Sequence, residues 1–440
     1  MTRVTVLGLG YLGSVHAAAM AHIGHDVLGV DVDADRVAAL RRGRAPFFEP
    51  GFPALLDRTL DTGRLRFTTS LEDAAGFGDV HFVCVGTPQL PGSFAADLRS
   101  VDALVEGLAP HLDRPCLIVG KSTVPVGTAA RMAARLAALA PAGRAAEVAW
   151  NPEFLREGFA VADTLRPDRI VVGLSSTRAD RLLREVYAPM LAAGTPYLTT
   201  DLATAELVKA AANAFLATKI SFINAMAEVC EASGADVVAL AAALGHDERI
   251  GRRFLRAGLG FGGGCLPKDI RAFVARAGEL GAGPALGFLR EVDAVNARCR
   301  QRTVDLACAL LGGSVAGHRI AVLGAAFKPD SDDVRDSPAL EVAAALHRRG
   351  GRVRVHDPEA VDNARAVCPV LDYTTEVEKA LEASSLVLLM TEWRQYLELD
   401  PAAALALVDQ PVVLDARNAL DVDGWRAAGW TVRGLGRPAR

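Results

Sequence analysis

The start of the chain, "RVTVLGLGYLGSVHAAAMAHIGHDVLGVDVD", has the pattern of a strand, a glycine-rich turn, a helix and a second strand. Val4–Leu7 form a short apolar run with β-branched residues, which is typical of a buried parallel strand. Ala17–Met20 continue a helix, and Val27–Val30 form the second strand. This order predicts an α/β fold with a doubly wound, Rossmann-like sheet, because parallel neighbouring strands need a helical crossover.

The turn carries the spacing GxGxxG at Gly8, Gly10 and Gly13. The first glycine permits the tight turn, the second lets a pyrophosphate approach the backbone, and the third lets the helix pack close to the strand. Asp31 ends the second strand about 20 residues on, where a carboxylate would bind ribose hydroxyls and repel a 2′-phosphate. The pattern therefore predicts NAD rather than NADP. The alternative is a glycine-rich turn without a ligand.

Further apolar strands ending in small-residue turns are predicted in "DVHFVCVGTP", "CLIVGKSTVPVGT", "VAWNPEFLREG" and "DRIVVG". Ligands of such sheets gather at the carboxyl ends of the strands. Any one polar residue there could equally be a cap or a turn residue, but a shared position favours a common site. The candidates just past these strand ends are Thr87, Ser122, Thr123, Glu153 and Glu157.

The middle of the chain predicts one long helix from Asp201, in "TAELVKAAANAFLATKISFINAMAEVCEASG". Apolar residues recur there at helical spacing, and we expect a connector between domains that also forms a dimer seam. Lys209 and Asn213 are four residues apart and so share one face of this helix. The alternative is a solvated lysine and an asparagine without a role.

Cys265 lies in "GFGGGCLPKD", where glycines are most dense and a helix is predicted to start near Lys268. A cysteine just before a helix gains from the helix dipole and the free N–H groups, which stabilise a thiolate. The glycines would let a ligand come close. We therefore predict a nucleophile, with Lys268 and Asp269 as nearby helpers. The alternative is a buried structural thiol, as Cys84 and Cys116 are expected to be.

The last part of the chain repeats the strand–turn–helix–strand pattern, with strands at Ile320–Leu323 and Val353–Val355 and a helix at Pro338–His347. Only one glycine of the fingerprint is present, so this half should not bind a dinucleotide by the usual grip. A long polar segment, "AFKPDSDDVRDS", takes the place of the phosphate loop. Its Lys328 and Arg335 could bind phosphates, or the segment could be a solvated loop.

Composition limits the class of protein. The chain has 440 residues, of which 51% are hydrophobic and 23% charged, which fits two or three globular domains. The net charge of −4 without a basic block speaks against nucleic acid. Seven scattered cysteines predict reduced thiols in a cytoplasm and no disulfide or metal site. We read no signal peptide, and the Ala-rich runs indicate surface helices rather than membrane spans.

Taken in order, these segments resemble the nucleotide-sugar 6-dehydrogenases, the UDP-glucose/GDP-mannose dehydrogenase family, above all its UDP-glucose branch. The resemblance covers nearly the whole length. It rests on "GLGYLG", "STVPVG", "NPEFLREG", the helix with Lys209 and Asn213, "FLRAGLGFGGGCLPKD", "FKPDSDDVRDSP" and "DARN". It implies two Rossmann-like domains joined by a long central helix and a small helical domain. The expected domains are 1–198 (NAD-binding), 199–312 (dimerisation, with the cysteine loop) and 313–440 (nucleotide-sugar binding).

The resemblance implies an NAD-dependent four-electron oxidation of a sugar 6-hydroxymethyl group to a carboxylate. Cys265 would attack the aldehyde to give a thiohemiacetal, which becomes a thioester that water hydrolyses. Lys209 matches a lysine that stabilises the oxyanion, and Asn213 its hydrogen-bonding partner. Asp269 matches an acid in proton transfer. Glu153 matches a glutamate of thioester hydrolysis, and Thr123 a water-holding hydroxyl.

Further roles are implied for binding residues. Arg249 matches an arginine that reaches the substrate of the other subunit, so we expect at least a homodimer. The implied substrate-binding residues are Phe154, Leu155, Arg156, Glu157, Lys209, Asn213, Arg249, Phe254, Leu255, Arg256, Gly262, Phe327, Lys328 and Arg417. The implied cofactor-binding residues are Gly8, Gly10, Tyr11, Leu12, Gly13, Asp31, Arg36, Thr87, Ser122, Thr123, Glu157, Lys268 and Arg335. No metal, nucleic-acid or membrane partner is implied.

The chain departs from the family at Gly264, where a serine is common. A backbone role would survive this change, and a hydroxyl role would not. The segment "RIGRRFLRAGLGFGGGC" favours UDP-glucose over GDP-mannose and over N-acetyl-mannosamine branches, in which a histidine commonly precedes the cysteine. A dTDP-glucose substrate stays open. Two other classes stay open as well: an NAD-binding protein without catalysis, and a two-electron hydroxyacid dehydrogenase, which would not need the cysteine.

Overall fold

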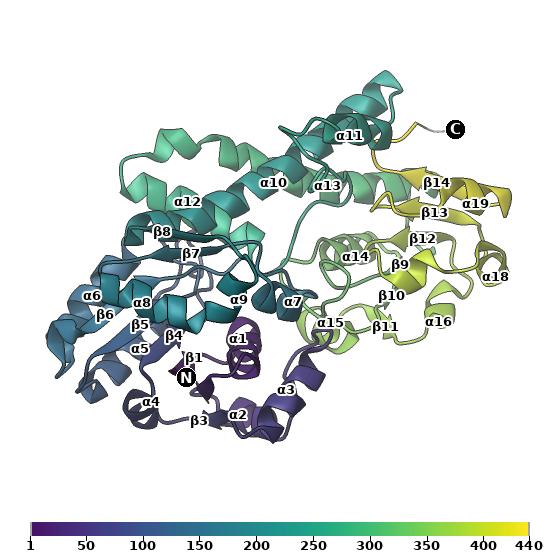
Figure 1. The fold of residues 1–440 in the computed structure, drawn as a ribbon. Helices are drawn as coiled ribbons and strands as arrows, with labels where there is room; N and C mark the ends of the chain where they lie inside the picture. The colour runs from purple at the N-terminus through teal and green to yellow at the C-terminus, as the bar shows by residue number, and fades with distance from the viewer. Residues whose placement is uncertain (1, 439–440) are drawn as a thin grey trace. The chain divides into compact units, whose positions relative to one another are not determined.

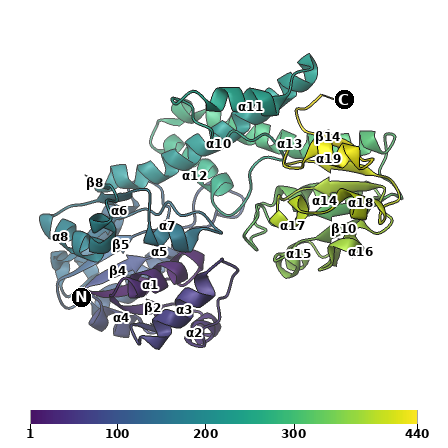
Figure 2. The same cartoon turned by 45° about the vertical axis from the view of Figure 1, so that its right-hand side comes forward.

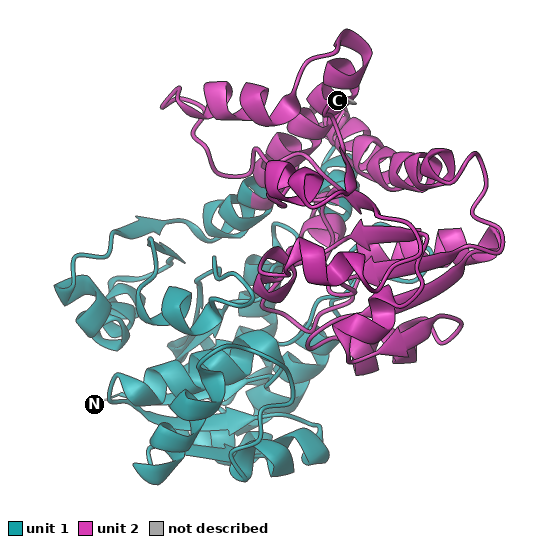
Figure 3. Cartoon of the chain, turned by 90° about the vertical axis from the view of Figure 1, so that its right-hand side faces the viewer, with its two compact units in different colours: residues 1–212, 271–281 teal, residues 213–270, 282–440 magenta. Residues whose placement is uncertain are grey.

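The structure is a computed structural model that describes residues 2–438. The chain forms two compact units, coloured separately in Figure 3. Unit 1 comprises residues 1–212 and 271–281, and unit 2 comprises residues 213–270 and 282–440.

Unit 1 contains an eight-stranded sheet in the order β3-β2-β1-β4-β5-β6-β7-β8 (Figure 1). The chain order reverses between β1 and β4, as in a doubly wound sheet, and this switch point is where such folds bind ligands. The strands are β1 (Arg3–Leu7), β2 (Asp26–Val30), β3 (Leu65–Thr68), β4 (Val80–Val83), β5 (Cys116–Gly120), β6 (Ala146–Trp150), β7 (Ile170–Gly173) and β8 (Tyr197–Thr200).

The strands of this sheet are parallel from β3 to β6, whereas β7 runs antiparallel to β6 and β8 runs parallel to β7. The sequence pattern of "DRIVVG" did not reveal this reversal. Since the carboxyl ends of β1, β4, β5 and β6 meet at one edge, Thr87, Ser122, Thr123 and Glu153 all follow strand ends at that edge.

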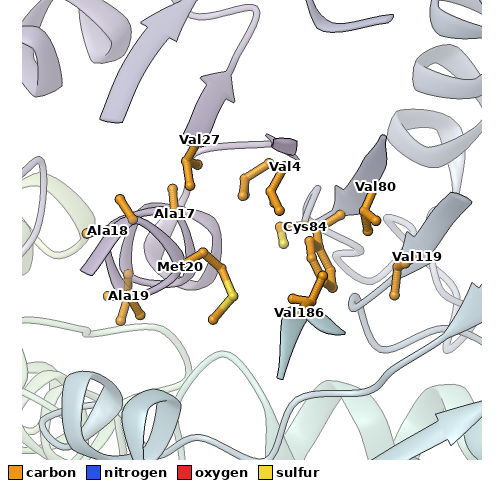
Figure 4. Packing of buried hydrophobic residues seen from close by; sticks show 14 of the residues in the cluster. Val4, Ala17, Ala18, Ala19, Met20, Val27, Val80, Cys84, Val119 and Val186 are labelled. Carbon is orange, nitrogen blue, oxygen red and sulfur yellow. The ribbon is translucent and has the colours of Figure 1, made fainter. Parts of the chain in front are cut away.

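The helices of unit 1 connect these strands. Helix α1 is buried without interruption from Gly13 to Ala21, which explains its run of small apolar residues. Met20 of this helix belongs to one buried apolar cluster with Val4, Val27, Cys84 and Val186 (Figure 4). The helices are α1 (Tyr11–His22), α2 (Ala34–Arg41), α3 (Phe52–Asp61), α4 (Leu71–Phe77), α5 (Arg99–Leu108), α6 (Thr128–Leu139), α7 (Ala160–Leu165), α8 (Thr177–Val186), α9 (Ala188–Ala192) and the short 3-10 helices η1 (Ala109–His111) and η2 (Gly143–Ala145).

The middle of the chain is helical. The predicted long helix is α10 (Leu202–Ser233), one continuous helix of 32 residues. It is followed by α11 (Val237–Gly245), α12 (Leu266–Glu279), η3 (Gly283–Leu286) and α13 (Phe288–Leu310). Helix α12 begins two residues before the predicted start, because Pro267 lies in its first turn, where a missing N–H costs nothing.

Unit 2 contains a second sheet, with six parallel strands in the order β11-β10-β9-β12-β13-β14. Helix α14 packs on β10 (Figure 2), and α16 packs on β9 and β10. The strands are β9 (Arg319–Leu323), β10 (Arg352–His356), β11 (Asp372–Thr374), β12 (Leu386–Leu389), β13 (Val412–Asp415) and β14 (Thr431–Gly434). The helices are α14 (Pro338–Arg348), α15 (Val361–Val367), α16 (Val377–Leu381), α17 (Arg394–Leu397), α18 (Pro401–Leu405) and α19 (Val422–Ala427).

Two doubly wound, Rossmann-like sheets and a long helix in the middle of the chain confirm the predicted fold class. Within the first of them, the turn after β1 depends on glycine. Gly8 has a φ of +94°, a conformation that favours glycine. A Cβ at Gly13 would lie 1.8 Å from the carbonyl oxygen of Gly8, whereas a Cβ at Gly10 would meet nothing within 4 Å.

This difference predicts opposite outcomes for two alanine substitutions in one turn. Gly13→Ala forces α1 away from β1 and should lower the free energy of unfolding by about 3 kcal/mol or more. Gly10→Ala removes only a glycine before the helix and should cost less than about 1 kcal/mol. Chemical denaturation of both variants checks this, and equal losses of stability would contradict the close contact at Gly13.

Candidate active site

The turn between β1 and α1 fits a pyrophosphate. Helix α1 has Gly10 at its N-cap and no side-chain cap, so its first amides are not covered by a side chain of the turn. The space beside Gly10 is open. An anion placed there would meet backbone N–H groups and the positive end of the helix dipole. Tyr11 and Leu12 form the first turn of α1.

Asp31 lies directly after β2 and beside this turn. Its carboxylate accepts a hydrogen bond from the Leu9 amide at 2.7 Å and pairs with Arg36 at 3.0 Å. The other oxygen accepts from the Asp33 amide. Asp31 is 7% exposed. The structure thus brings together the acid and the arginine that the sequence predicted for the adenosine-ribose end.

The hydroxyl groups of Thr87 and Ser122, which follow β4 and β5, form hydrogen bonds within the protein. The Ser122 hydroxyl donates to the Val85 carbonyl at 2.6 Å, and the Thr87 hydroxyl donates to the Thr123 carbonyl at 2.7 Å. These bonds tie the turn after β4 to the turn after β5. The hydroxyl protons of Ser122 and Thr87 are therefore used within the protein, and their oxygens stay available as acceptors.

Lys209 and Glu153 form an ion pair in unit 1. The Lys209 Nζ lies 3.0 Å from Glu153 Oε1, and their side chains are 7% and 13% exposed. The other Glu153 oxygen accepts from the Leu155 amide at 2.7 Å. The Lys209 ammonium also lies 5.6 Å from the centre of the Phe154 ring. Four predicted site residues therefore meet around one partly dry ion pair, where a charge acts more strongly than in water.

In unit 2, Asp269 joins two other predicted residues. Asn213 donates to Asp269 Oδ2 at 2.7 Å, and Lys268 donates to Oδ1 at 2.5 Å. Asp269 is 4% exposed. It lies in the first turn of α12, where its amide donates to the Cys265 carbonyl. The Asp269 carboxylate is thus held between an amide and an ammonium, one turn from the cysteine.

Cys265 differs from the structural cysteines. It is exposed, directly before the 14-residue helix α12. Cys84 and Cys116 are buried, and burial raises the pKa of Cys84 to about 12 and of Cys116 to about 11. Burial also raises the pKa of Cys299 to about 11. These buried thiols stay protonated at neutral pH, whereas Cys265 has the exposure and the helix terminus that favour a reactive thiolate.

The segment before Cys265 is fastened at almost every residue. The Asn296 side chain accepts from the Phe261 amide at 2.8 Å and donates to its carbonyl at 3.0 Å. Asn224 accepts from the Gly258 amide, and Arg417 donates to the Gly260 carbonyl. These bonds satisfy the backbone of an irregular buried segment and fix the place of the cysteine within unit 2.

The glycines of this segment have a different purpose from the predicted one. We expected them to let a ligand come close, but a Cβ would strike the protein itself. It would lie 2.3 Å from Asn296 at Gly260, 2.3 Å from the Asp336 carbonyl at Gly262, and 2.7 Å from the Phe327 ring at Gly263. At Gly264 it would lie 2.3 Å from the Arg335 guanidinium. The chain packs on its own atoms, which the sequence pattern alone could not distinguish from a ligand.

Arg417 anchors the predicted substrate loop. Its guanidinium donates to the carbonyls of Met390, Phe327 and Gly260. Burial lowers the pKa of Arg417. Since Phe327 and Gly260 belong to two segments far apart in sequence, Arg417 joins the polar loop after β9 to the cysteine loop. Lys328 lies with its ammonium 5.6 Å from the Phe327 ring centre.

Three of the remaining predicted arginines pair with acids close in sequence. Arg156 pairs with Asp163 at 2.7 Å, Arg249 with Asp247 at 2.7 Å, and Arg335 with Asp333 at 2.7 Å. Arg256 lies 3.4 Å from Glu392. Near it, Phe254 is 38% exposed with a φ of 63°, whereas Leu255 is buried. The Arg249 side chain is 89% exposed, so it is available to a ligand or a second chain.

The turn after β9 differs from the turn after β1 in how its amides are bound. Asp357, at the end of β10, accepts from the amides of Ala325 and Ala326 at 2.7 and 2.9 Å. The Trp393 indole donates to the same carboxylate oxygen. Two consecutive amides of this turn are therefore held by a carboxylate, whereas in unit 1 Asp31 holds one amide of the turn, that of Leu9.

Two buried residues were missed by the sequence reasoning. Asn296 fastens the cysteine loop from α13, and nothing in its helical context marks it. Lys121 is 7% exposed at the end of β5, with its Nζ 2.9 Å from Asn151 Oδ1. The signal for Lys121 was present in "CLIVGKSTVPVGT", where a lysine directly follows a buried strand.

Residues 2–438 contain neither a cluster suited to a metal ion nor a helix suited to cross a membrane. No group of histidine, cysteine or acidic side chains among them could hold a metal ion. None of the described helices is long and apolar enough to cross a membrane.

Comparison with known proteins identifies the family of the chain. Residues 2–191, 203–298 and 321–422 match three models of the UDP-glucose/GDP-mannose dehydrogenase family, described as its NAD binding, central and UDP binding domains. The chain is 40% identical to UDP-glucose 6-dehydrogenase YwqF of Bacillus subtilis, with 99% of this chain and 98% of the relative covered. It is 41% identical to UDP-glucose 6-dehydrogenase of Rhizobium meliloti, with 99% and 100% covered.

A solved UDP-glucose dehydrogenase from Pyrobaculum islandicum superposes with a TM-score of 0.91 at 41% identity, covering 99% of this chain and 98% of that one. The glycine turn suited to NAD and the two doubly wound sheets agree with these matches. The chain is a member of the UDP-glucose/GDP-mannose dehydrogenase family, an NAD-dependent dehydrogenase that acts on a nucleotide sugar.

Proposed function

We propose that the protein oxidises UDP-glucose to UDP-glucuronate at C6, with two NAD molecules per sugar. The observation that carries this proposal is Cys265, an exposed thiol before a helix of 14 residues, on a segment fastened along its length. A dehydrogenase that stops at an aldehyde or ketone needs no nucleophile. A cysteine held in this way is suited to retain an aldehyde for a second oxidation.

The reaction follows from these groups. NAD, when bound, accepts a hydride in each of the two oxidations. The first oxidation converts the C6 alcohol to an aldehyde, and the Cys265 sulfur adds to its carbon to give a thiohemiacetal. The second removes a hydride from that carbon and a proton from its hydroxyl group, and it leaves a thioester. Water then adds to the thioester, the carbon–sulfur bond breaks, and the carboxylate and the free thiol are released.

Lys209 is suited to stabilise the oxygen anion that forms in these steps, because its ammonium is fixed in a partly dry environment. Glu153 is suited to take a proton from the attacking water. Asn213 and Asp269 are joined by a hydrogen bond, which supports a role for Asp269 in proton transfer and for Asn213 in orienting it. We assign Thr123 to the holding of water.

For binding, we assign NAD to the turn after β1, with Asp31 at the adenosine ribose and Arg335 at a phosphate. We assign the nucleotide sugar to Phe154–Glu157, Phe254–Arg256 and Gly262 with Phe327, Lys328 and Arg417. The functional division that we propose is 1–198, 199–312 and 313–440, and one family model falls within each range. The proposed compartment is the cytoplasm.

The proposed assembly is a homodimer. Phe215, Phe222 and Val229 lie seven residues apart on α10 and are 66%, 49% and 55% exposed. A repeat of seven keeps apolar side chains on one face of a helix and is typical of a seam between two helices. A second copy of this chain is the occupant that we propose. The same assembly would make Arg249 available to the partner's substrate.

Among alternative substrates, dTDP-glucose differs least from UDP-glucose, because the two differ only in the nucleotide. GDP-mannose is disfavoured, since the relatives at about 40% identity carry the name UDP-glucose 6-dehydrogenase. A UDP-N-acetyl-mannosamine dehydrogenase from Pyrococcus horikoshii is only 27% identical to this chain, which disfavours that substrate as well. An NAD-binding protein without catalysis is disfavoured by the simultaneous presence of Cys265, Lys209 and Asp269.

The number of NADH molecules formed per sugar tests the proposed function. With limiting UDP-glucose, wild-type protein should form two NADH and a product of uronate mass, whereas dTDP-glucose and GDP-mannose should react more slowly. Cys265→Ser should lose at least about 100-fold in the rate of complete oxidation and still bind NAD, as measured by fluorescence titration. One NADH per sugar, or two from the serine variant, would contradict the thioester route.

Sedimentation tests the assembly. Phe222→Glu places a charge on the proposed seam, so the variant should sediment as a monomer where wild type is a dimer. Val367→Glu is the matched control, because Val367 is 67% exposed on α15 and outside the proposed seam. Dimeric Phe222→Glu protein, or a monomeric control, would contradict the seam.

A further inference from the structure

Lys121 is a buried cation for which the proposed reaction has no role. It follows β5 and is 7% exposed. Its Nζ donates to Asn151 Oδ1 at 2.9 Å and lies 3.4 Å from the Tyr187 hydroxyl and 3.5 Å from the Asn151 carbonyl. It also lies 5.7 Å from the centre of the Phe82 ring. Its direct contacts are therefore neutral dipoles and a ring face.

Such an ammonium is unfavourable for folding. Burial lowers the pKa of Lys121 to about 8, which still leaves it mostly protonated at pH 7. A charge removed from water without a carboxylate in contact loses hydration that dipoles replace only in part. A neutral side chain would meet the same hydrogen-bonding need, because Asn151 Oδ1 also accepts from the Tyr187 hydroxyl at 2.6 Å. The charge itself therefore requires an explanation.

One of the titratable groups around Lys121 carries the opposite charge. Burial raises the pKa of Cys84 to about 12 and that of Tyr187 well above its ordinary value, so both are neutral. His16, on α1, is neutral as well, because burial and the Lys121 charge lower its pKa. Glu153 is the remaining group, and its attraction favours the charged form of Lys121.

Asn151 connects Lys121 to the segment that carries Glu153. It follows β6, two residues before Glu153, and its amide group donates to the Val171 carbonyl at 2.8 Å. Lys121 thus contacts Asn151 on the segment that carries Glu153, and its charge and the Glu153 carboxylate attract each other. Glu153 also pairs with Lys209, at 3.0 Å.

We propose that Lys121 is a positioning residue for Glu153, whose fixed charge supports the Glu153 carboxylate when Lys209 turns to the oxygen anion of the thioester hydrolysis. This inference rests on the proposed function. Lys209 has two anions to serve in that step, and one ammonium cannot neutralise both fully. Lys121 is buried and cannot follow the substrate, so its charge stays with Glu153 throughout.

Rapid-mixing kinetics with UDP-glucose test this, with Lys121→Met and Lys121→Gln as variants. Both remove the charge, and the glutamine keeps a donor for Asn151. We expect the formation of the first NADH to stay within about threefold of wild type and steady-state turnover to fall at least about tenfold. Two NADH per active site should then form in a burst, and intact-mass measurement should find the acyl group on the protein.

Thermal unfolding distinguishes a positioning lysine from a structural one, because loss of a structural lysine would lower the unfolding temperature. Since the charge is unfavourable for folding, both variants should unfold at the wild-type temperature or above. Tyr187→Phe is the matched control, because it removes the other hydrogen bond to Asn151 Oδ1 and keeps the charge. Its turnover should stay within about threefold of wild type.

Several outcomes would overturn the proposal: wild-type turnover in the glutamine variant, an equal loss in the first NADH step and in turnover, or unfolding of both variants at a lower temperature. If wild-type protein forms no NADH from UDP-glucose, the proposed function itself fails and this inference fails with it. If wild type forms two NADH and the variants accumulate no acyl protein, the inference alone fails.

Discussion

The fold depends on close contact between glycine backbones and other atoms of the same chain. In unit 1 the third glycine of the turn brings α1 onto the Gly8 carbonyl, and this contact sets the direction in which the helix points its amides. In unit 2 the glycines before Cys265 admit Asn296 and the Phe327 ring. In both places a side chain would move a helix terminus, and each terminus is suited to a negative charge.

The glycines also explain why irregular segments can be rigid here. A loop without side chains loses much conformational freedom on folding, and this cost has to be met by contacts. Asn296 supplies two hydrogen bonds to Phe261, and Arg417 joins Gly260 to Phe327. Because these donors and acceptors are buried, removing one would leave its partner without a hydrogen bond, which costs more than the bond itself contributes.

Much of this could be predicted from the sequence. Strand and helix periodicity gave both doubly wound sheets and α10, because buried strands and long helices have strong patterns. The residues at the carboxyl edge followed from the fold. The reversal of β7, the contacts of Asn296 and the purpose of the glycines in "GFGGGC" could not be predicted, because each depends on residues distant in sequence. Lys121 could have been found, since a lysine directly after an apolar strand at the ligand edge is itself unusual.

The two sheets show how one fold comes to differ in function. Each has an aspartate after its second strand, Asp31 in unit 1 and Asp357 in unit 2. Asp31 binds one amide of the preceding turn and an arginine, and the amides of the first turn of α1 are left to a ligand. Asp357 binds two consecutive amides and the Trp393 indole. The same carboxylate position thus holds one amide of the turn in the first unit and two in the second, so the second turn has one amide fewer to offer an anion.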